Sequence, residues 1–169
     1  MPLPRHQLDI IICPAHCEQV LSGQGGRRLL QKWQSHGWID ADGKCVLSHK
    51  NAMIQGGFAR LFLDQPEGMR FYGNHQGGYY VQCPTNSSNI VPSFVTAMKQ
   101  WRQNQHRSLH CPSCEQSHDL NDLYFRPPAA FAMGALVIQN VDSTEICPTV
   151  LNDLQLWLGD FKLVLKRMG

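Results

Sequence analysis

The feature that most constrains this chain is a pair of Cys-Pro turns in its second half. Cys83 and Cys111 each follow a short strand-like segment and each precede a proline, in the stretches Val81-Gln-Cys-Pro-Thr-Asn86 and Leu109-His-Cys-Pro-Ser-Cys114. Proline has no N–H to donate to a β-ladder, and it favours the start of a turn. Any fold of this region must therefore contain two strand ends that are each followed by a tight turn.

The two turns resemble the paired knuckles of a zinc ribbon, and the resemblance covers residues 80–126. In a zinc knuckle the turn directs backbone N–H groups at the cysteine thiolates, and two knuckles together complete a tetrahedral site. The resemblance implies a closed, structural zinc site on which Cys83, Cys111 and Cys114 converge. The chain between the turns also carries a full helix, which is longer than a minimal ribbon needs.

The first turn departs from the ribbon pattern because it ends in Asn86 rather than in a second cysteine. Asparagine is a poor zinc ligand, so a fourth ligand must come from elsewhere. His118, four residues after Cys114, or His110, beside Cys111, could supply it. We assign the metal ligands as Cys83, Cys111, Cys114 and His118, with zinc as the cofactor. The alternative is a site without metal, in which the three cysteines are small buried apolar residues and Asn86 takes the place of the missing thiolate.

Three helices are predicted. The first follows a loop over residues 14–26 and ends at Gly37, with Leu29, Leu30 and Trp33 on one face. The second begins at Pro92, and an apolar stripe runs along it at three- and four-residue steps, formed by Val91, Phe94, Val95, Met98 and Trp101. The third begins at Pro148 and ends at Gly159. These patterns favour helices of ordinary length that each bury one face.

Short strands fill most of the remaining chain. The apolar run Leu8–Cys13 predicts a buried strand, and the alternation from Phe161 to Lys166 predicts a half-buried one. Residues 58–63, 69–72 and 79–82 are expected to form a three-stranded meander, and further strands are expected at residues 44–48, 109–111 and 135–141. Without a regular βαβ rhythm, the fold class is α+β with antiparallel strands. We expect an N-terminal α+β half over residues 1–79 and a C-terminal half with the knuckles over residues 80–169, with one continuous domain as the alternative.

Charge and cysteine usage limit the class of protein. The formal net charge of the 169 residues is only +2, which excludes a strongly basic nucleic-acid arm or an acidic tail. No apolar run is long enough to cross a membrane, and the first apolar run is too short for a signal peptide. The seven cysteines are an odd number, so reduced thiols or metal ligands are favoured over a disulfide framework. We expect a cytoplasmic protein without membrane association.

Two cysteine pairs offer an alternative thiol chemistry. Cys13 and Cys17 flank His16, and a neighbouring imidazolium can activate a thiol. A structural loop is the simpler interpretation of that segment. Cys111 and Cys114 have the spacing of a redox dithiol, but the residues that follow lack the amphipathic helix of a thioredoxin-like site.

Two further segments could contact anions. Ser22-Gly-Gln-Gly-Gly-Arg27 precedes a helix, but it lacks the ending of a P-loop, so a flexible loop is the preferred interpretation. A group of basic residues lies near Trp101 in the sequence and could either bind nucleic acid or form the solvated face of a helix. These residues are Lys99, Arg102, His106 and Arg107.

No catalytic set emerges from the sequence, which contains no serine elbow. The sequence therefore favours a non-enzymatic binding protein with a degenerate zinc-ribbon-like site. A protein partner is favoured over nucleic acid because the net charge is close to neutral. The alternatives are a small enzyme that uses a thiol of Cys13, Cys17, Cys111 or Cys114, and a nucleic-acid-binding ribbon protein that acts through the Arg102 edge.

Overall fold

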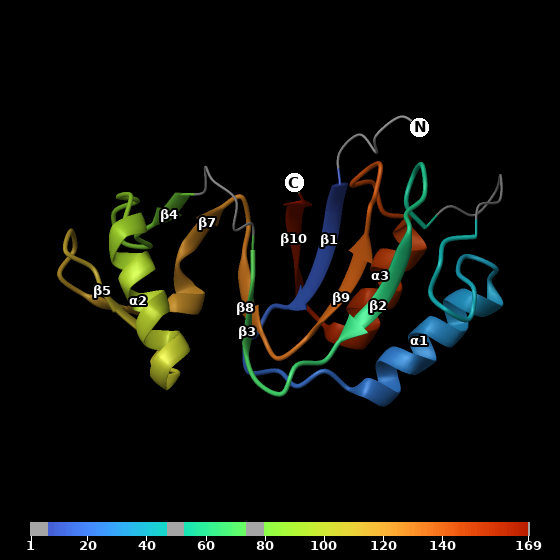
Figure 1. Ribbon diagram of the computed structural model, residues 1–169, viewed down its shortest axis with the longest axis horizontal. Coiled ribbons are helices and arrows are strands. Elements are labelled where there is room, and N and C mark those ends of the chain that lie inside the picture. Colours follow the sequence, from blue (N-terminus) through green and yellow to red (C-terminus); the bar gives the residue numbers. More distant parts are fainter. Residues whose placement is uncertain (1–6, 47–52, 74–79, 169) are drawn as a thin grey trace. The chain divides into compact units, whose positions relative to one another are not determined.

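The computed structural model describes residues 7–46, 53–73 and 80–168, and these residues form an α+β structure (Figure 1). The helices are α1 (Gly23–Ser35), α2 (Val91–Asn104) and α3 (Pro148–Leu158), with a 3-10 turn, η1 (Leu120–Asp122). The strands are β1 (Gln7–Pro14), β2 (Arg60–Asp64), β3 (Arg70–Tyr72), β4 (Tyr80–Gln82), β5 (Ser108–His110), β6 (Ser117–Asp119), β7 (Tyr124–Arg126), β8 (Ala130–Ala132), β9 (Ala135–Gln139) and β10 (Phe161–Met168). The expected fold class and its three main helices are confirmed.

The chain divides into two compact units, and one of them is discontinuous in sequence. Unit 1 comprises Met1–Gly73 and Ala130–Gly169, and unit 2 comprises Asn74–Ala129. The sequence-based division into residues 1–79 and 80–169 differs from this grouping, because residues 130–169 lie with the N-terminal segment. The physical reason is that β1 forms backbone ladders with both β9 and β10.

Unit 1 is built on an antiparallel sheet with the strand order β10-β1-β9-β2. The central strand β1 pairs with β10 over eight residues, from Gln7 opposite Met168 to Pro14 opposite Phe161. Both faces of β1 are covered, which explains its continuous apolar run. Ile10 and Ile12 enter the core beneath α1 and α3, while Ile11 and Cys13 enter a second cluster with β8. Burying each large apolar side chain contributes roughly 1.5–3 kcal/mol.

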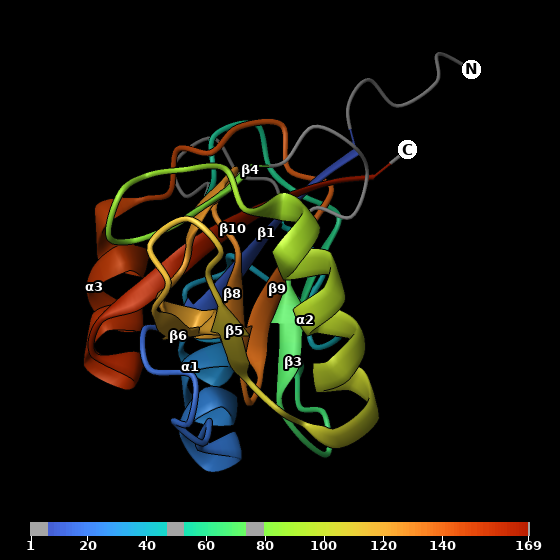
Figure 2. The ribbon, with the colours of Figure 1, turned by 90° about the vertical axis from the view of Figure 1, so that its left-hand side faces the viewer.

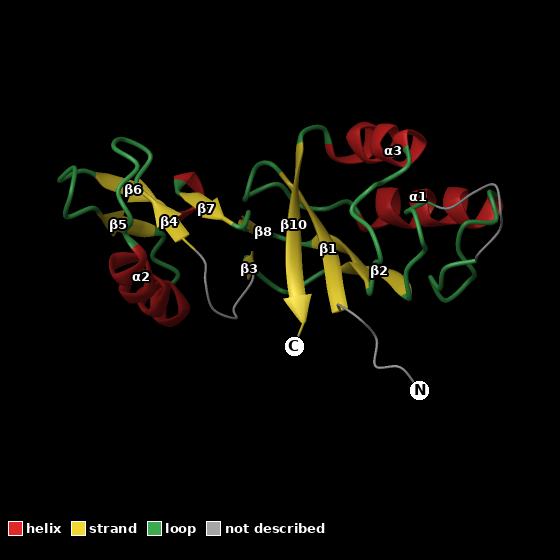
Figure 3. Cartoon of the chain, turned by 90° about the horizontal axis from the view of Figure 1, so that it is seen from above, coloured by secondary structure: helices red, strands yellow, loops and turns green. Residues whose placement is uncertain are grey.

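Helices α1 and α3 lie next to each other in unit 1 (Figure 3). A buried carboxylate joins them: Asp153 accepts a hydrogen bond from Trp33 Nε1 at 2.9 Å and pairs with Lys32 Nζ at 2.6 Å. Burial alone would raise the pKa of Asp153, but the Lys32 and Trp33 donors hold it below its ordinary value. The buried charge is therefore satisfied in its ionised form.

The glycine-rich residues 23–26 form the first turn of α1 and not a loop before it. Ser22 is the N-cap, and its side chain accepts a hydrogen bond from the Gly25 N–H. A Cβ at Gly25 would lie 3.0 Å from the Trp157 ring, and one at Gly26 would lie 2.5 Å from Leu63 Cδ1. The expected loop is therefore confirmed over residues 15–22 and corrected at residues 23–26, which belong to α1. The glycines there let α1 pack closely on its neighbours.

The predicted meander of β2, β3 and β4 is also wrong, although the strands themselves are present. Strand β2 pairs with β9, β3 pairs with β8, and β4 pairs with β7. The partners β7 and β8 have three residues each, too few to show a period of two in the sequence. The expected strand over residues 44–48 reaches outside the described residues, and its described part forms only isolated bridges at Lys44 and Cys45.

Unit 2 consists of the ribbons β4–β7 and β5–β6 with α2 packed against β4 and β5 (Figure 2). The α2 stripe predicted from the sequence is mostly buried, through Phe94, Met98 and Trp101. Val95 is 40% exposed, because it lies outside the narrower arc of the helix that faces the strands. The ring of Phe94 packs edge-on against Phe125 of β7 at 5.3 Å between centroids.

Candidate metal centre

The first Cys-Pro turn directly follows β4 and has a fixed hydrogen-bond pattern. The N–H of Cys83 donates to the Ser88 carbonyl at 2.9 Å, and the Cys83 carbonyl accepts from the Ser87 N–H at 2.9 Å. Ser87 has a φ of 62°, an uncommon left-handed conformation for a residue other than glycine. These bonds close a loop that leaves the Cys83 side chain fully buried at its base.

The second turn, after β5, repeats this backbone conformation at Cys111. The N–H of Cys111 donates to the Gln116 carbonyl at 2.9 Å, and its carbonyl accepts from the Glu115 N–H at 2.9 Å. Glu115 has a φ of 61°, matching Ser87 at the same place in the first turn. The two segments are therefore two copies of one local structure, as two knuckles of a ribbon are.

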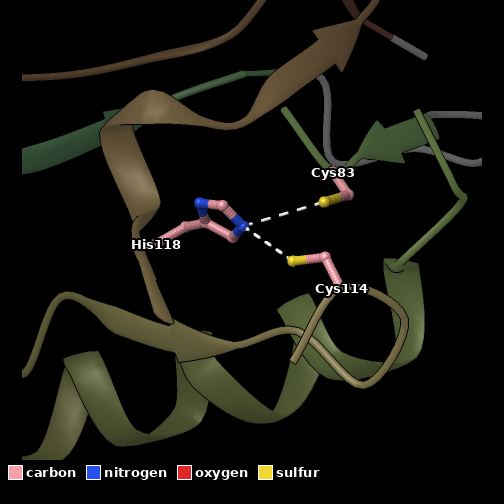
Figure 4. Close-up of side chains that lie close together, drawn as sticks. All are labelled: Cys83, Cys114 and His118. Carbon is pink, nitrogen blue, oxygen red and sulfur yellow. Dashed lines mark hydrogen bonds between the residues drawn. The ribbon is translucent and has the colours of Figure 1, made fainter. Parts of the chain in front are cut away.

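The side chains of Cys83, Cys114 and His118 meet between the two turns (Figure 4). His118 Nε2 lies 3.2 Å from Cys114 Sγ and 3.7 Å from Cys83 Sγ, and the three potential ligand atoms lie within 4.8 Å of one another. Cys111 adjoins them: its sulfur accepts from the Cys114 N–H at 3.5 Å, and its thiol interacts with the thiols of Cys83 and Cys114. The expected convergence of the three cysteines and His118 is confirmed.

His118 reaches the cluster because β6 pairs with β5. In this ladder His118 lies directly opposite the buried Leu109, so the two side chains share one face of the ribbon. His110 lies opposite Ser117 on the other face and is exposed. Of the two histidines that the sequence left open, the structure thus brings only His118 to the thiols.

Asn86 holds the two turns together rather than filling the place of a thiolate. Its Nδ2 donates to Ser113 Oγ of the second turn at 2.8 Å. Its Oδ1 accepts from the N–H of Ser88 at 3.1 Å and from Ser88 Oγ at 2.8 Å. This link could not be predicted from the sequence, because Asn86 and Ser113 are 27 residues apart and only the folded chain brings the two turns together.

The surroundings of the cluster favour a negative charge on one sulfur. Burial alone would raise the pKa of Cys83, but the backbone N–H groups of Asn86 and Thr85 and the neighbouring thiols lower it to about 6. The pKa of Cys114 is raised, by burial first and then by Cys83 and Cys111, against a backbone N–H at Gln116 that lowers it. Backbone donors directed at a sulfur are what stabilise a metal-bound thiolate.

The donor set and its spacing fit a tetrahedral zinc ion. Three thiols and one imidazole are soft to borderline ligands, which select zinc over calcium or magnesium. With Zn–S bonds of about 2.3 Å and a Zn–N bond of about 2.0 Å, tetrahedral geometry separates sulfur from nitrogen by about 3.5 Å. The distances from His118 to the sulfurs of Cys114 and Cys83, 3.2 and 3.7 Å, lie on either side of that value.

The other sequence-based candidates do not assemble into a site. Cys13 is fully buried in unit 1, and its burial raises the pKa to about 12, ahead of smaller effects of Lys162 and Asp64. Cys17 is buried, whereas His16 is exposed. All seven cysteines are free thiols. The raised pKa of Cys13 argues against an activated thiol at this position.

The basic edge proposed for nucleic acid is also modest. Trp101 lies in the core at the inner side of α2, so its ring is not presented beside Lys99 and Arg102. Arg107 lies within 3.5 Å of Asp119, which offsets its charge.

Comparisons with protein-family models, with curated proteins and with solved structures found no match to this chain. Within the described residues, no helix combines the length and the apolar character needed to cross a membrane.

Proposed function

We propose that the chain is a non-enzymatic cytoplasmic binding protein in which zinc stabilises unit 2, with Cys83, Cys111, Cys114 and His118 as ligands. The observation that carries the proposal is the meeting of His118 with the sulfurs of Cys83 and Cys114 at separations that suit a tetrahedral ion. A zinc ion with four protein ligands has no open position, so its role is structural. A protein partner fits the formal net charge of +2 better than a polyanion does.

Native mass spectrometry of the full chain under reducing conditions tests the metal part of the proposal. One zinc ion per chain is expected, and it should be lost in Cys83→Ser and Cys114→Ser and bound more weakly in His118→Ala. The control is His110→Ala, which removes an exposed histidine of the same ribbon and should keep the ion. A reduced native chain that stays metal-free after addition of one equivalent of zinc contradicts the proposal.

A second candidate function is thiol chemistry at the same cluster. The lowered pKa of Cys83 and its contact with two further thiols favour it. The full burial of Cys83 argues against it, because a reactive thiol needs access for its substrate. Alkylation by iodoacetamide decides between them: zinc-loaded protein should react slowly at all three site cysteines, whereas a thiol enzyme would react fast at Cys83.

A third candidate, nucleic-acid binding through the Arg102 edge, predicts an affinity that falls steeply with salt. We expect no appreciable binding at physiological salt. If the chain binds nucleic acid tightly and charge reversal at Arg102 and Arg107 abolishes this binding, nucleic-acid binding becomes the preferred function.

A further inference from the structure

One face of the β4–β7 ribbon is polar and aromatic and points away from the core of unit 2. Tyr80 lies directly opposite Arg126, and Gln82 lies directly opposite Tyr124. Residues that face each other across a ladder project from the same side of the sheet, so these four side chains share one face. Val81 and Phe125 alternate with them and turn inward. We call this set, Tyr80, Gln82, Tyr124 and Arg126, the outer face.

The two tyrosines of the outer face are unusually open. Tyr80 is 56% exposed and Tyr124 is 59% exposed, and they are the only aromatic residues among the exposed large apolar side chains of the described chain. They lie diagonally across the ribbon, an arrangement that typically separates the two Cα atoms by roughly 7 Å. Arg126 is also exposed and makes no ion pair with any described residue. Two open rings and one unpaired cation thus lie together.

We propose that the outer face binds an acidic, proline-rich segment of a partner protein. Tyrosine and arginine are the residues that contribute most to binding at protein interfaces. Exposed aromatic rings accept the prolines of an already extended segment, which loses little conformational entropy on binding. Arg126 then pairs with a carboxylate beside those prolines. This inference rests on the proposed function in that it takes the partner to be a protein.

Charge separates this partner from two other occupants of the outer face. Residues 74–129 contain four lysines and arginines against three acidic residues, and the face itself offers one cation, whereas a nucleic-acid strand requires several phosphate contacts. A second copy of the chain would bring Arg126 against the same basic face, which carries no acidic residue. An acidic peptide is the occupant that satisfies both the rings and the cation.

The test is fluorescence anisotropy with the full, reduced chain and labelled twelve-residue peptides. One peptide has four central prolines flanked by glutamates, a second has lysines in place of the glutamates, and a third has alanines in place of the prolines. Only the first should bind well. Tyr80→Ala and Tyr124→Ala should each weaken it by about tenfold, and Tyr→Phe at either site by no more than about threefold. Arg126→Ala should remove the preference for glutamate, while Arg102→Ala and Val95→Ala, at exposed sites on α2, should change nothing.

Any of the following results would overturn the proposal. The first is equal binding of the glutamate and lysine peptides, or full affinity in the folded tyrosine-to-alanine variants. The second is tyrosine-dependent binding of oligothymidylate without peptide binding, which assigns the face to nucleic acid. The third is self-association that Tyr124→Ala abolishes, which assigns the face to a second copy. Zinc content measured on the same samples distinguishes the two proposals. A zinc-loaded chain that does not bind the peptides contradicts only the proposed role of the outer face. A zinc-free chain that binds them contradicts only the proposed zinc site.

Discussion

Asn86 stands where the zinc-ribbon pattern has a cysteine, and its hydrogen bonds give it a different role. The side chain donates to Ser113 in the opposite turn and accepts twice from Ser88 in its own turn. It therefore fixes the distance between the turns that carry Cys83 and Cys114. In the proposed site the fourth ligand is His118 of β6, so the number of donors remains four although Asn86 is not one of them.

Asn86→Ala should weaken zinc binding without removing any ligand. Loss of a residue that orients metal ligands typically costs about 10–100-fold in affinity, and the lost hydrogen bonds should lower the free energy of unfolding by about 1–2 kcal/mol. Competition with a chromophoric chelator and urea unfolding measure the two effects. Gln100→Ala, at an exposed site on α2, is the control. Native affinity in Asn86→Ala would show that the bridge does not position the site.

Asp153→Ala should destabilise unit 1 in a pH-dependent way. The change leaves the buried Trp33 Nε1 without its acceptor and should lower the free energy of unfolding by about 1–3 kcal/mol at pH 7. Because the pKa of Asp153 is lower in the folded than in the unfolded state, its contribution is full above about pH 4 and is lost as the pH falls through the folded value. The difference in the free energy of unfolding between the native protein and the variant, measured by urea unfolding, should thus become smaller toward pH 2. An equal difference at both pH values contradicts this account, and the exposed Asp142→Ala serves as a control.

At the scale of single elements, α1 shows how packing overrides propensity. Glycine in a helix costs about 1 kcal/mol relative to alanine, yet the first turn of α1 contains Gly23, Gly25 and Gly26. The close approach of Trp157 and Leu63 explains Gly25 and Gly26. Sequence reasoning assigned these residues to a loop because glycine normally signals one, and the neighbours that require them lie far along the chain.

Gly26→Ala should therefore destabilise the protein despite its better helix propensity. The new Cβ would lie 2.5 Å from Leu63 Cδ1 and 3.1 Å from Trp157, and overpacking of this kind costs about 1–3 kcal/mol. Gly68→Ala is the matched control, because its Cβ would meet nothing within 4 Å. Thermal unfolding of both variants gives the comparison. A Gly26→Ala chain at least as stable as the native one would show that α1 does not need the close approach.

Elements with a long hydrophobic period were predictable. The short strands β3, β4 and β5 were also predicted, but β6, β7 and β8 and the pairing of all the short strands were not. Helices α2 and α3 and strands β1 and β10 follow from apolar repeats and from prolines and glycines at their ends. Strands β6, β7 and β8 have three residues each and depend on partners elsewhere in the chain. The two Cys-Pro turns predicted which cysteines converge, but they provided no physical ground for the assignment of His118 in preference to His110. That choice depends on the register of β5 against β6.

Removal of residues 148–169 should leave an unfolded or aggregating chain. The segment contains α3 and β10, and it buries Val150, Leu154 and Leu158 in the core of unit 1. Each such side chain contributes roughly 1.5–3 kcal/mol, which together approaches the whole stability of a domain. Circular dichroism during heating tests this. A truncated chain that melts cooperatively near the temperature of the full chain contradicts the assignment of this segment to the core.

At the scale of the whole molecule, unit 2 lies between two parts of unit 1 in the sequence. The segments that flank unit 2 in the sequence, β3 and β8, pair with each other in unit 1. The ribbons of unit 2 itself have only two strands each. Isolated two-stranded ribbons are marginally stable in water, so the proposed metal crosslink between the two turns would stabilise unit 2.

Chelation should affect the two units differently. Treatment with a strong zinc chelator should increase amide hydrogen exchange in β4, β5 and β6, which lead into or out of the turns, since site formation and folding are coupled. Exchange in β1 and β9 of unit 1 should change little. Hydrogen–deuterium exchange with mass spectrometry resolves these segments. Equal loss of protection in both units, or none in unit 2, contradicts a structural metal confined to unit 2.

The central claim is that the thiols of Cys83, Cys111 and Cys114 and the imidazole of His118 together bind one zinc ion. X-ray absorption at the zinc edge on the full, reduced protein tests it most directly, because it reports the number and type of the nearest ligand atoms. The account predicts three sulfur neighbours at about 2.3 Å and one nitrogen at about 2.0 Å. In His118→Ala the nitrogen should disappear or be replaced by oxygen. A shell of nitrogen and oxygen without sulfur, a shell of four sulfurs, or a protein that retains no zinc would contradict it.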